Sequence, residues 1–453
     1  MIADEPKNKI ITFGCRLNNF ESQSIKKALD EIEDKNLIVF NSCAVTAEAE
    51  KELRATIRKE KKLNPEAKIV ITGCASQINP EKYAKMPEVD LIIGNADKSK
   101  VESYNFNNEF NFKYQNKINE NQHADKIFQD FKNKYSLNLS QNEHAKIRVN
   151  DIMSVQETAP QLASYFENQT RAFLEIQNGC NHRCTFCIIP FGRGNSRSVP
   201  FGVIVSQCKK MVEAGHQEIV LTGVDISDYG KDLPASMNLS QMIKRLLKNV
   251  PDLKRLRLSS IDVAEIDDEF IEIMASDPRL MPYLHLSVQS GDDIILKRMK
   301  RRHHRKQILD FCQKIRQNRP EITFGADIIA GFPTEDEAMF ANSLSLIQEA
   351  DLIFTHIFPY SAKEGTPASK MPQLEKKIIK ERAKILREAG AKQLNQYLAR
   401  QVGKEFKVLI EKNQRGKTEN FLDVKIISSQ ELQENNIYSL KINSFTKNQL
   451  IVN

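Results

Sequence analysis

The sequence predicts an α/β protein in three parts. These are an N-terminal parallel sheet of βα units, a central partial (β/α)6 barrel and a small C-terminal all-β module. The prediction rests on short apolar runs that alternate with longer amphipathic stretches, and on the loss of the helical stretches near the end of the 453 residues. The expected boundaries are 1–104 for the N-terminal domain, 105–165 for an Asn- and Lys-rich connector, 166–400 for the barrel and 401–453 for the β module.

The first hundred residues repeat a strand-then-helix pattern. The predicted strands are Lys9–Phe13, Leu37–Phe40, Lys68–Thr72 and Leu91–Ile93, and the predicted helices are Glu21–Glu33 and Thr46–Leu63. A cysteine follows each of the first three strands, namely Cys15, Cys43 and Cys74. Because α/β sheets place their ligands at the carboxyl ends of the strands, this repeated placement indicates a shared site.

Six further strand candidates alternate with helical stretches and predict the incomplete barrel. They are Ala172–Ile176, Glu218–Thr222, Arg255–Ser259, Leu284–Val288, Thr323–Ile329 and Ile353–Phe358. A closing helix is expected over Gln373–Arg400. The runs Phe406–Ile410, Phe421–Ile427 and Tyr438–Ile442 then predict the β module.

Composition narrows the class of protein. The chain lacks an apolar run of about 18 residues and an apolar N-terminal segment, so we expect a cytoplasmic protein with no membrane association. The net charge of +7 favours an anionic partner only weakly at this length. Eight cysteines in such a chain indicate metal binding or catalysis rather than a disulfide framework. Cys208 and Cys312 lie alone in helical patterns and are expected to be buried.

The strongest single motif is Cys180-x-x-x-Cys184-x-x-Cys187, directly after the first barrel strand. Three thiolates on one tight loop can hold three irons of a cubane cluster and leave the fourth iron open to a ligand. Zinc is the main competitor, but structural zinc takes four ligands, and no fourth is obvious beside the loop.

This loop, with Phe186 in the aromatic position of CxxxCx(aromatic)C, resembles the radical S-adenosylmethionine superfamily. Taken with the N-terminal motifs, the chain resembles the radical S-adenosylmethionine methylthiotransferases over nearly its whole length. The motifs that carry this resemblance are GCRLN at Cys15, NSCAVT at Cys43, TGC at Cys74, NGCNHRCTFCIIPFGRGNSRS, SVQSGDD and ADIIAGFPTE. The β module resembles the TRAM domain of that family.

The resemblance implies two [4Fe–4S] clusters, one on Cys15, Cys43 and Cys74 and one on Cys180, Cys184 and Cys187, together with S-adenosylmethionine. It implies that one S-adenosylmethionine methylates sulfur at the N-terminal cluster, and that another is cleaved to a 5′-deoxyadenosyl radical that activates a C–H bond. It assigns no catalytic side chain.

Four residues are candidates for contact with S-adenosylmethionine. Phe186 lies in the cluster motif, and Ser259, Gln289 and Asp327 lie at strand ends facing the predicted barrel mouth. The last three could equally be polar groups that cap the strands.

Three substrate branches of the family are considered: isopentenyl-adenosine in tRNA, threonylcarbamoyl-adenosine in tRNA, and an aspartate of a ribosomal protein. The first cysteine motif, GCRLN, and the segment Arg257-Leu258-Ser259-Ser260-Ile261-Asp262 resemble the threonylcarbamoyl branch. This implies methylthiolation of C2 of N6-threonylcarbamoyladenosine at position 37 of tRNA. A non-catalytic iron–sulfur RNA-binding protein is the alternative from a different class.

A run of basic residues, Lys297 to Arg305, supports an RNA partner through phosphate attraction. The candidate contacts are Arg298, Lys300, Arg301 and Arg302, with Arg193 and Arg197 extending the track. A solvated helix start would give the same pattern. The expected partners are tRNA, a reducing electron-donor protein and a sulfur source.

Overall fold

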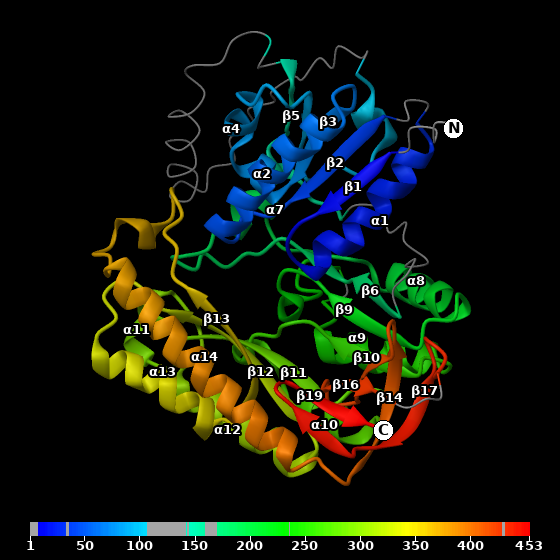
Figure 1. Ribbon diagram of the computed structural model, residues 1–453, viewed down its shortest axis with the longest axis vertical. Coiled ribbons are helices and arrows are strands. Elements are labelled where there is room, and N and C mark those ends of the chain that lie inside the picture. Colours follow the sequence, from blue (N-terminus) through cyan, green and yellow to red (C-terminus); the bar gives the residue numbers. More distant parts are fainter. Residues whose placement is uncertain are drawn as a thin grey trace. The chain divides into compact units, whose positions relative to one another are not determined.

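The computed structural model describes residues 8–32, 36–106, 142, 145–158, 170–234, 236–427 and 431–453 (Figure 1). Most of the predicted connector, 105–165, lies outside these residues. The chain divides into two compact units. Unit 1 comprises Met1–Ala163, Asn178–Arg197 and Ser361–Ser369, and unit 2 comprises Ser164–Gln177, Ser198–Tyr360 and Lys370–Asn453.

Unit 1 contains the predicted parallel sheet, with strand order β1-β2-β3-β4-β5. Its strands are β1 (Lys9–Thr12), β2 (Leu37–Ser42), β3 (Lys68–Gly73), β4 (Leu91–Ile93) and β5 (Ile147–Arg148). Its helices are α1 (Arg16–Asp30), α2 (Ala47–Leu63), α3 (Cys74–Ile78), α4 (Pro80–Ala84), α7 (Ile189–Arg193), η1 (Val101–Tyr104) and η3 (Ile152–Ser154). The predicted N-terminal α/β fold is confirmed.

Helix α1 begins earlier than predicted, directly after Cys15, which occupies its N-cap position with an extended backbone. No side-chain cap hydrogen bond marks this start, so the sequence lacks the usual Ser, Thr, Asp or Asn signal there. The helix buries Leu17, Phe20 and Ile25, and Glu21 lies on the same buried stripe. The early start places the Cys15 thiol at the positive end of a helix.

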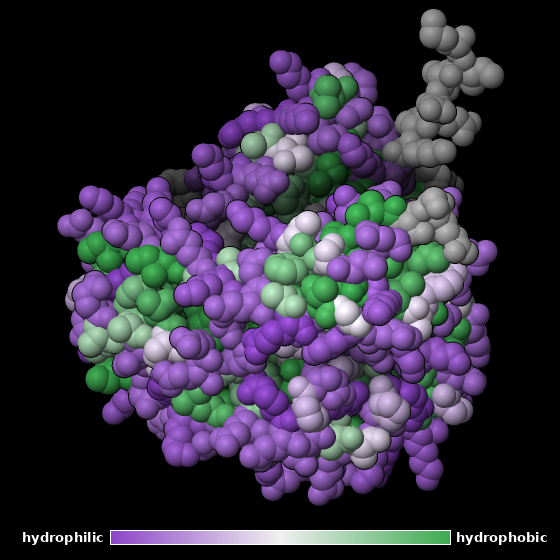
Figure 2. All heavy atoms as spheres, turned by 60° about the horizontal axis from the view of Figure 1, so that its bottom comes forward, coloured by the Kyte–Doolittle hydropathy of each residue, from purple (hydrophilic) through white to green (hydrophobic). Residues whose placement is uncertain are grey.

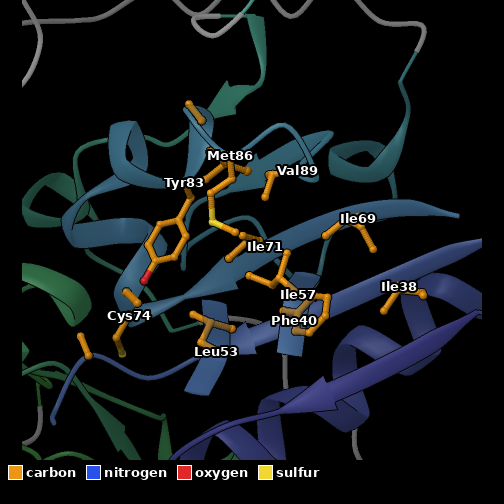
Figure 3. Packing of buried hydrophobic residues seen from close by; sticks show 14 of the residues in the cluster. Ile38, Phe40, Leu53, Ile57, Ile69, Ile71, Cys74, Tyr83, Met86 and Val89 are labelled. Atoms are coloured by element: carbon orange, nitrogen blue, oxygen red, sulfur yellow. The ribbon is translucent and has the colours of Figure 1, made fainter. Parts of the chain in front are cut away.

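The core of this sheet reaches the site of the third cysteine. Phe40, Ile69, Ile71 and Tyr83 pack in one buried cluster that also contains Cys74. Figure 3 shows Cys74 at one side of this cluster, with the hydroxyl end of Tyr83 directed toward that side. The cysteine is therefore held by a close-packed environment rather than by a loose loop.

Unit 2 contains the six barrel strands. They are β6 (Arg171–Glu175), β9 (Glu218–Thr222), β10 (Arg255–Leu258), β11 (Tyr283–Gln289), β12 (Thr323–Ala330) and β13 (Leu352–Pro359). The helices are α8 (Phe201–Glu213), α9 (Leu239–Asn249), α10 (Asp268–Ser276), α11 (Asp293–Arg298), α12 (Arg305–Asn318), α13 (Glu337–Glu349), α14 (Lys376–Ala399), η4 (Ile226–Asp228) and η5 (Val263–Glu265). The chain passes between the units at β7 (Gln177–Asn178), β8 (Arg197–Ser198) and η6 (Pro367–Lys370).

The strands form two parallel three-stranded sheets, β10-β9-β6 and β11-β12-β13. A parallel bridge between Ile261 and Leu286 joins the segment after β10 to β11, so the six strands follow one another as in a partial barrel. The predicted incomplete barrel is confirmed. Its carboxyl ends carry Ser259, directly after β10, and Gln289, the last residue of β11.

The C-terminal module is a six-stranded sheet of order β17-β14-β15-β16-β19-β18. Its strands are β14 (Glu405–Glu411), β15 (Arg415–Lys417), β16 (Asp423–Ile426), β17 (Ile437–Lys441), β18 (Ser444–Thr446) and β19 (Gln449–Val452). The predicted all-β module is confirmed, although β15, β18 and β19 are too short to show periodicity in the sequence.

A buried ion pair links this module to the barrel within unit 2. Arg257 of β10 bonds Glu218 of β9 through two nitrogens, at 2.8 and 2.9 Å, and both side chains are fully buried. The same guanidinium donates to the backbone oxygen of Glu419 at 3.1 Å and lies over the ring of Phe421. Breaking such a pair by removing one partner typically costs about 3–5 kcal/mol.

The visible face of the molecule is mostly hydrophilic, with apolar side chains in scattered patches (Figure 2). Among the described helices, none combines the length and apolar character needed to span a bilayer.

Candidate active site and iron–sulfur ligands

The Cys180 loop belongs to unit 1, although the strand before it belongs to the barrel. Cys180, Cys184 and Cys187 are half-buried cysteines that form no disulfide bond among the described residues. Two backbone bonds shape the loop: Cys187 N donates to Cys184 O, and Cys180 N donates to Gly194 O, each at 3.0 Å. Phe186 lies half-buried between the last two cysteines. Three thiols on one closed turn are the donor set of a cluster with one open iron.

Gly179 makes this turn possible. Its φ of +74° lies in the left-handed region, and a Cβ there would lie 1.9 Å from the backbone oxygen of Asn195. The loop therefore approaches the 194–195 segment more closely than any side chain at position 179 would allow. Arg183 closes the same turn from within, through bonds to Cys180 O and Asn195 Oδ1, both at 2.8 Å.

The structure brings the three N-terminal cysteines together. A Cβ placed on Gly14 would lie 2.8 Å from Cys43 Sγ, so the residue before Cys15 directly adjoins the second cysteine. The pKa of the Cys43 thiol is raised to about 11, mainly by burial, and the neighbouring Cys74 and Cys15 sulfurs act in the same direction. The three thiols that follow the carboxyl ends of β1, β2 and β3 therefore lie close together, as the sequence predicted.

The segment after the Cys180 loop packs directly on Cys74. A Cβ on Gly192, in α7, would lie 3.2 Å from Cys74 Cβ, which leaves little room for a side chain there. The next residue, Arg193, donates from Nε to Cys74 Sγ at 3.1 Å. Asn95 Nδ2 lies 3.8 Å from the same sulfur and also donates to Gly192 O.

Arg193 and Arg197 were predicted to extend an RNA-binding track, and this prediction is wrong. Both are buried, with 3% and 6% of their surface exposed, so neither can reach a phosphate backbone. The sequence analysis missed the contact of Arg193 with Cys74. The available signal was Glu21, its partner, which occupies a position on the apolar stripe of α1.

Three residues proposed to contact S-adenosylmethionine lie in or directly after neighbouring strands of unit 2: Ser259 follows β10, Gln289 ends β11 and Asp327 lies in β12. Ser259 is 8% exposed, and its hydroxyl has no hydrogen-bond partner in the part of the chain that the structure describes. Gln289 has a φ of +69°, a rare conformation for a residue other than glycine, and follows a register shift in β11. Buried unpaired hydroxyls and strained backbone are concentrated at functional sites.

Asp327 of β12 is held between two histidines. His285 Nε2 lies 2.9 Å and His356 Nδ1 lies 3.3 Å from its Oδ1. Burial acts to raise the pKa of Asp327, but the hydrogen bonds and charges of the two histidines outweigh it and hold the pKa well below its usual range. Tyr283 in turn bonds His285 Nδ1 at 2.9 Å, so the histidine ring is fixed at both nitrogens.

The basic run Lys297 to Arg305, which begins in the last turn of α11, is divided between surface and interior. Lys300 and Arg302 are exposed. Arg301 has 8% of its side chain exposed and bonds Asp262 at 3.0 Å. Arg298 donates to Thr334 Oγ1 at 2.8 Å. Arg302, although exposed, bonds Glu265 at 2.6 Å and Asp262 at 3.3 Å. Three of the four candidate residues therefore make contacts that hold the fold.

The remaining cysteines are confirmed as buried. Cys208 and Cys312 are 0% and 1% exposed, and burial raises the pKa of each thiol to about 12. They stay protonated at neutral pH and are unsuited to hold metal.

Two family profiles match the chain. The profile described as "Radical SAM superfamily" matches residues 174–347, and the one described as "Uncharacterized protein family UPF0004" matches residues 7–94. Among solved structures, the radical S-adenosylmethionine methyltransferase TsrM from Kitasatospora setae gives a TM-score of 0.54 at 12% identity, covering 80% of this chain and 77% of that one. This likeness supports the fold alone.

Curated relatives match over nearly the whole length. "Threonylcarbamoyladenosine tRNA methylthiotransferase MtaB" of Rickettsia prowazekii is 52% identical over 420 residues, covering 93% of this chain and 91% of the relative. The Aquifex aeolicus protein of the same name is 34% identical, covering 91% and 95%. "tRNA-2-methylthio-N(6)-dimethylallyladenosine synthase" of Erythrobacter litoralis is 30% identical, covering 89% and 86%.

Fold and cysteine motif define a radical S-adenosylmethionine enzyme. Within that superfamily, the chain belongs to the methylthiotransferase family. Membership implies a [4Fe–4S] cluster and S-adenosylmethionine, and the thiols of Cys180, Cys184 and Cys187 fit that cluster as donors.

Replacing Gly179 with Ala should remove iron from the Cys180 loop, because the new methyl group would collide with Asn195 O. Iron is measured in protein whose Cys15, Cys43 and Cys74 are replaced by Ala, so that only the loop contributes. Gly202→Ala is the matched control, since nothing lies within 4 Å of a Cβ at that helical position. Equal iron in the two variants would refute the role given to Gly179.

Proposed function

We propose that the chain methylthiolates C2 of N6-threonylcarbamoyladenosine at position 37 of tRNA. The observation that carries this proposal is the 52% identity, over 93% of the chain, to a relative named for threonylcarbamoyladenosine tRNA methylthiotransferase activity. The identity to the dimethylallyladenosine synthase of Erythrobacter litoralis is 30%. The segment Arg257 to Asp262 supports the same branch. An electron-donor protein and a sulfur source are the further partners that this reaction requires.

A second [4Fe–4S] cluster on Cys15, Cys43 and Cys74 is part of the proposal. The convergence of three thiols supports it. So does the hydroxyl of Tyr83, which is 1% exposed and has no partner among the described residues although it is directed toward the Cys74 side of the core (Figure 3). A buried hydroxyl without a partner fits a site that holds an acceptor when loaded.

When bound, the cluster of the Cys180 loop supplies the electron that cleaves S-adenosylmethionine to a radical. The chain's own residues orient that cofactor. We assign Phe186, Ser259, Gln289 and Asp327 to this task. The unpaired hydroxyl of Ser259 can donate to a polar group of the cofactor. Asp327, kept ionised by His285 and His356, can accept hydrogen bonds from the amino or hydroxyl groups of S-adenosylmethionine.

For tRNA, Lys300 and Arg302, which are the exposed residues among the four candidates, are the proposed phosphate contacts. Arg302 would offer its charge to phosphate beside its ion pairs with Glu265 and Asp262. Arg298 and Arg301 support them by fixing the segment to Thr334 and Asp262. Phosphate contacts of this kind position an RNA without reading its sequence.

The function is tested by nucleoside mass spectrometry of tRNA from cells that lack the gene and carry a variant of it. Wild-type protein and Cys208→Ala should restore the 2-methylthio product, whereas Cys184→Ala and Cys43→Ala should not. In vitro, Cys43→Ala should still release 5′-deoxyadenosine, because its Cys180 loop is intact. A methylthio group on isopentenyl-adenosine or on a ribosomal protein would instead support the other branches.

Replacing Ser259 with Ala should weaken S-adenosylmethionine binding by about 5- to 20-fold, which is the cost of one hydrogen bond of roughly 1–1.8 kcal/mol. Equilibrium binding to the reconstituted protein measures this. Ser276→Ala, at the exposed end of α10, is the control. An affinity equal to that of the control would exclude Ser259 from the cofactor site.

Replacing Lys300 and Arg302 with Gln should weaken binding of any tRNA and make the slope of log K against log salt shallower by up to about 0.7–0.9 per lost contact. Lys209→Gln with Lys210→Gln, two exposed residues of α8, removes the same charge elsewhere. Cleavage of S-adenosylmethionine without tRNA should persist in both. Identical slopes for the two pairs would show that the run is only a solvated surface.

A further inference from the structure

A buried network of charged side chains lies beside Cys74, and the proposed function assigns no role to it. Arg193 donates from Nε to Cys74 Sγ at 3.1 Å and from Nη2 to Glu21 Oε2 at 2.9 Å. Lys98 Nζ lies 2.6 Å from the same Glu21 oxygen and donates to Asn95 Oδ1 at 2.8 Å. All of these residues belong to unit 1.

The burial of this network is nearly complete. The side chains of Arg193 and Lys98 are each 3% exposed, and that of Glu21 is 9% exposed. Each buried ion has lost its hydration, which costs several kcal/mol unless partners replace the water. One carboxylate between two cations leaves a net positive charge directly beside a cysteine sulfur.

The geometry fixes the direction of the Arg193 side chain. Glu21 takes both Nη atoms, and Asn18 Oδ1 accepts from Nη2 as well. Only Nε is left to face the sulfur. Gly192 brings the backbone of α7 against Cys74, so the Nε–H bond requires no movement of the chain.

We propose that Arg193 is a positioning residue for the N-terminal cluster, whose Nε–H bond to Cys74 Sγ stabilises the reduced form of that cluster. Adding an electron increases the negative charge on the thiolates, and hydrogen bonds to cluster sulfurs raise the reduction potential. The inference rests on the proposed second cluster. In this proposal the motif supplies ligands to one cluster, and Arg193 in the segment after it supplies a hydrogen bond to a ligand of the other.

The test uses the full chain with Cys180, Cys184 and Cys187 replaced by Ala, so that only the N-terminal cluster is present. The parent protein for all variants also carries Glu21→Gln. Without this change, removal of Arg193 or Lys98 would leave the buried Glu21 carboxylate without one of its cations. Arg193→Met and Lys98→Met are then compared. Each leaves one buried cation and the same net charge, but only the Lys98→Met protein keeps the N–H bond to sulfur.

The reduced-to-oxidised ratio of the cluster is measured by electron paramagnetic resonance at a series of fixed potentials. Arg193→Met should lower this ratio at least tenfold relative to Lys98→Met, which is about 59 mV for a one-electron couple. Equal ratios in the two proteins would overturn the role of Arg193.

If the Arg193→Met protein binds no iron, Arg193→Lys replaces it in the measurement. It keeps the charge of the Glu21→Gln parent and lacks the guanidinium fork, so its ratio should fall below that of the parent. An unchanged ratio would also overturn the inference. If the triple-Ala protein with Glu21 and Arg193 intact binds no iron, the second cluster itself is refuted, which is a separate result.

Discussion

The close contact of α7 with Cys74 is the constraint on which the arrangement of both cysteine sets depends. Gly192 favours it, because a Cβ there would lie 3.2 Å from both Cys74 Cβ and Ile78 Cδ1. After the barrel strand β6 the chain enters unit 1. The Cys180 loop therefore belongs to the same compact unit as Cys15, Cys43 and Cys74. The donors of both proposed clusters therefore belong to one compact unit, and residues far apart in the sequence share one packed core.

Two buried arginine–glutamate pairs among the described residues, Arg257–Glu218 and Arg193–Glu21, serve different ends. Arg257 and Glu218 meet between adjacent strands, and the arginine's remaining bonds go to backbone oxygens of the β module. Arg193 and Glu21 also neutralise each other, but the remaining donor faces a cysteine sulfur. Since a buried pair contributes little net stability over an apolar replacement, its retention needs a reason. For Arg257 the reason is attachment of a module, and for Arg193 it is the contact with a metal-ligand candidate.

The sequence was sufficient where the signal is local. Strand periodicity gave the parallel sheet, the six barrel strands and most of the β module, and strand-end placement gave the convergence of Cys15, Cys43 and Cys74. It failed where a partner lies far along the chain. Arg193 and Glu21 are 172 positions apart, so nothing local distinguished Arg193 from a surface cation. The start of α1 was missed for a different reason, because its N-cap is a cysteine without a cap bond.

The segment Arg257 to Asp262, whose sequence indicates the substrate branch, makes mainly structural contacts. Arg257 holds the β module, and Asp262 holds Arg301 at the base of the basic run. Burial acts to raise the pKa of Asp262, but His303 and Arg301 keep it well below its usual range, so the carboxylate is charged at neutral pH. Ser259 lies between them in the sequence, and its hydroxyl has no hydrogen-bond partner among the described residues. The segment that resembles the threonylcarbamoyl branch therefore fixes both the β module and the basic run, through Arg257 and Asp262.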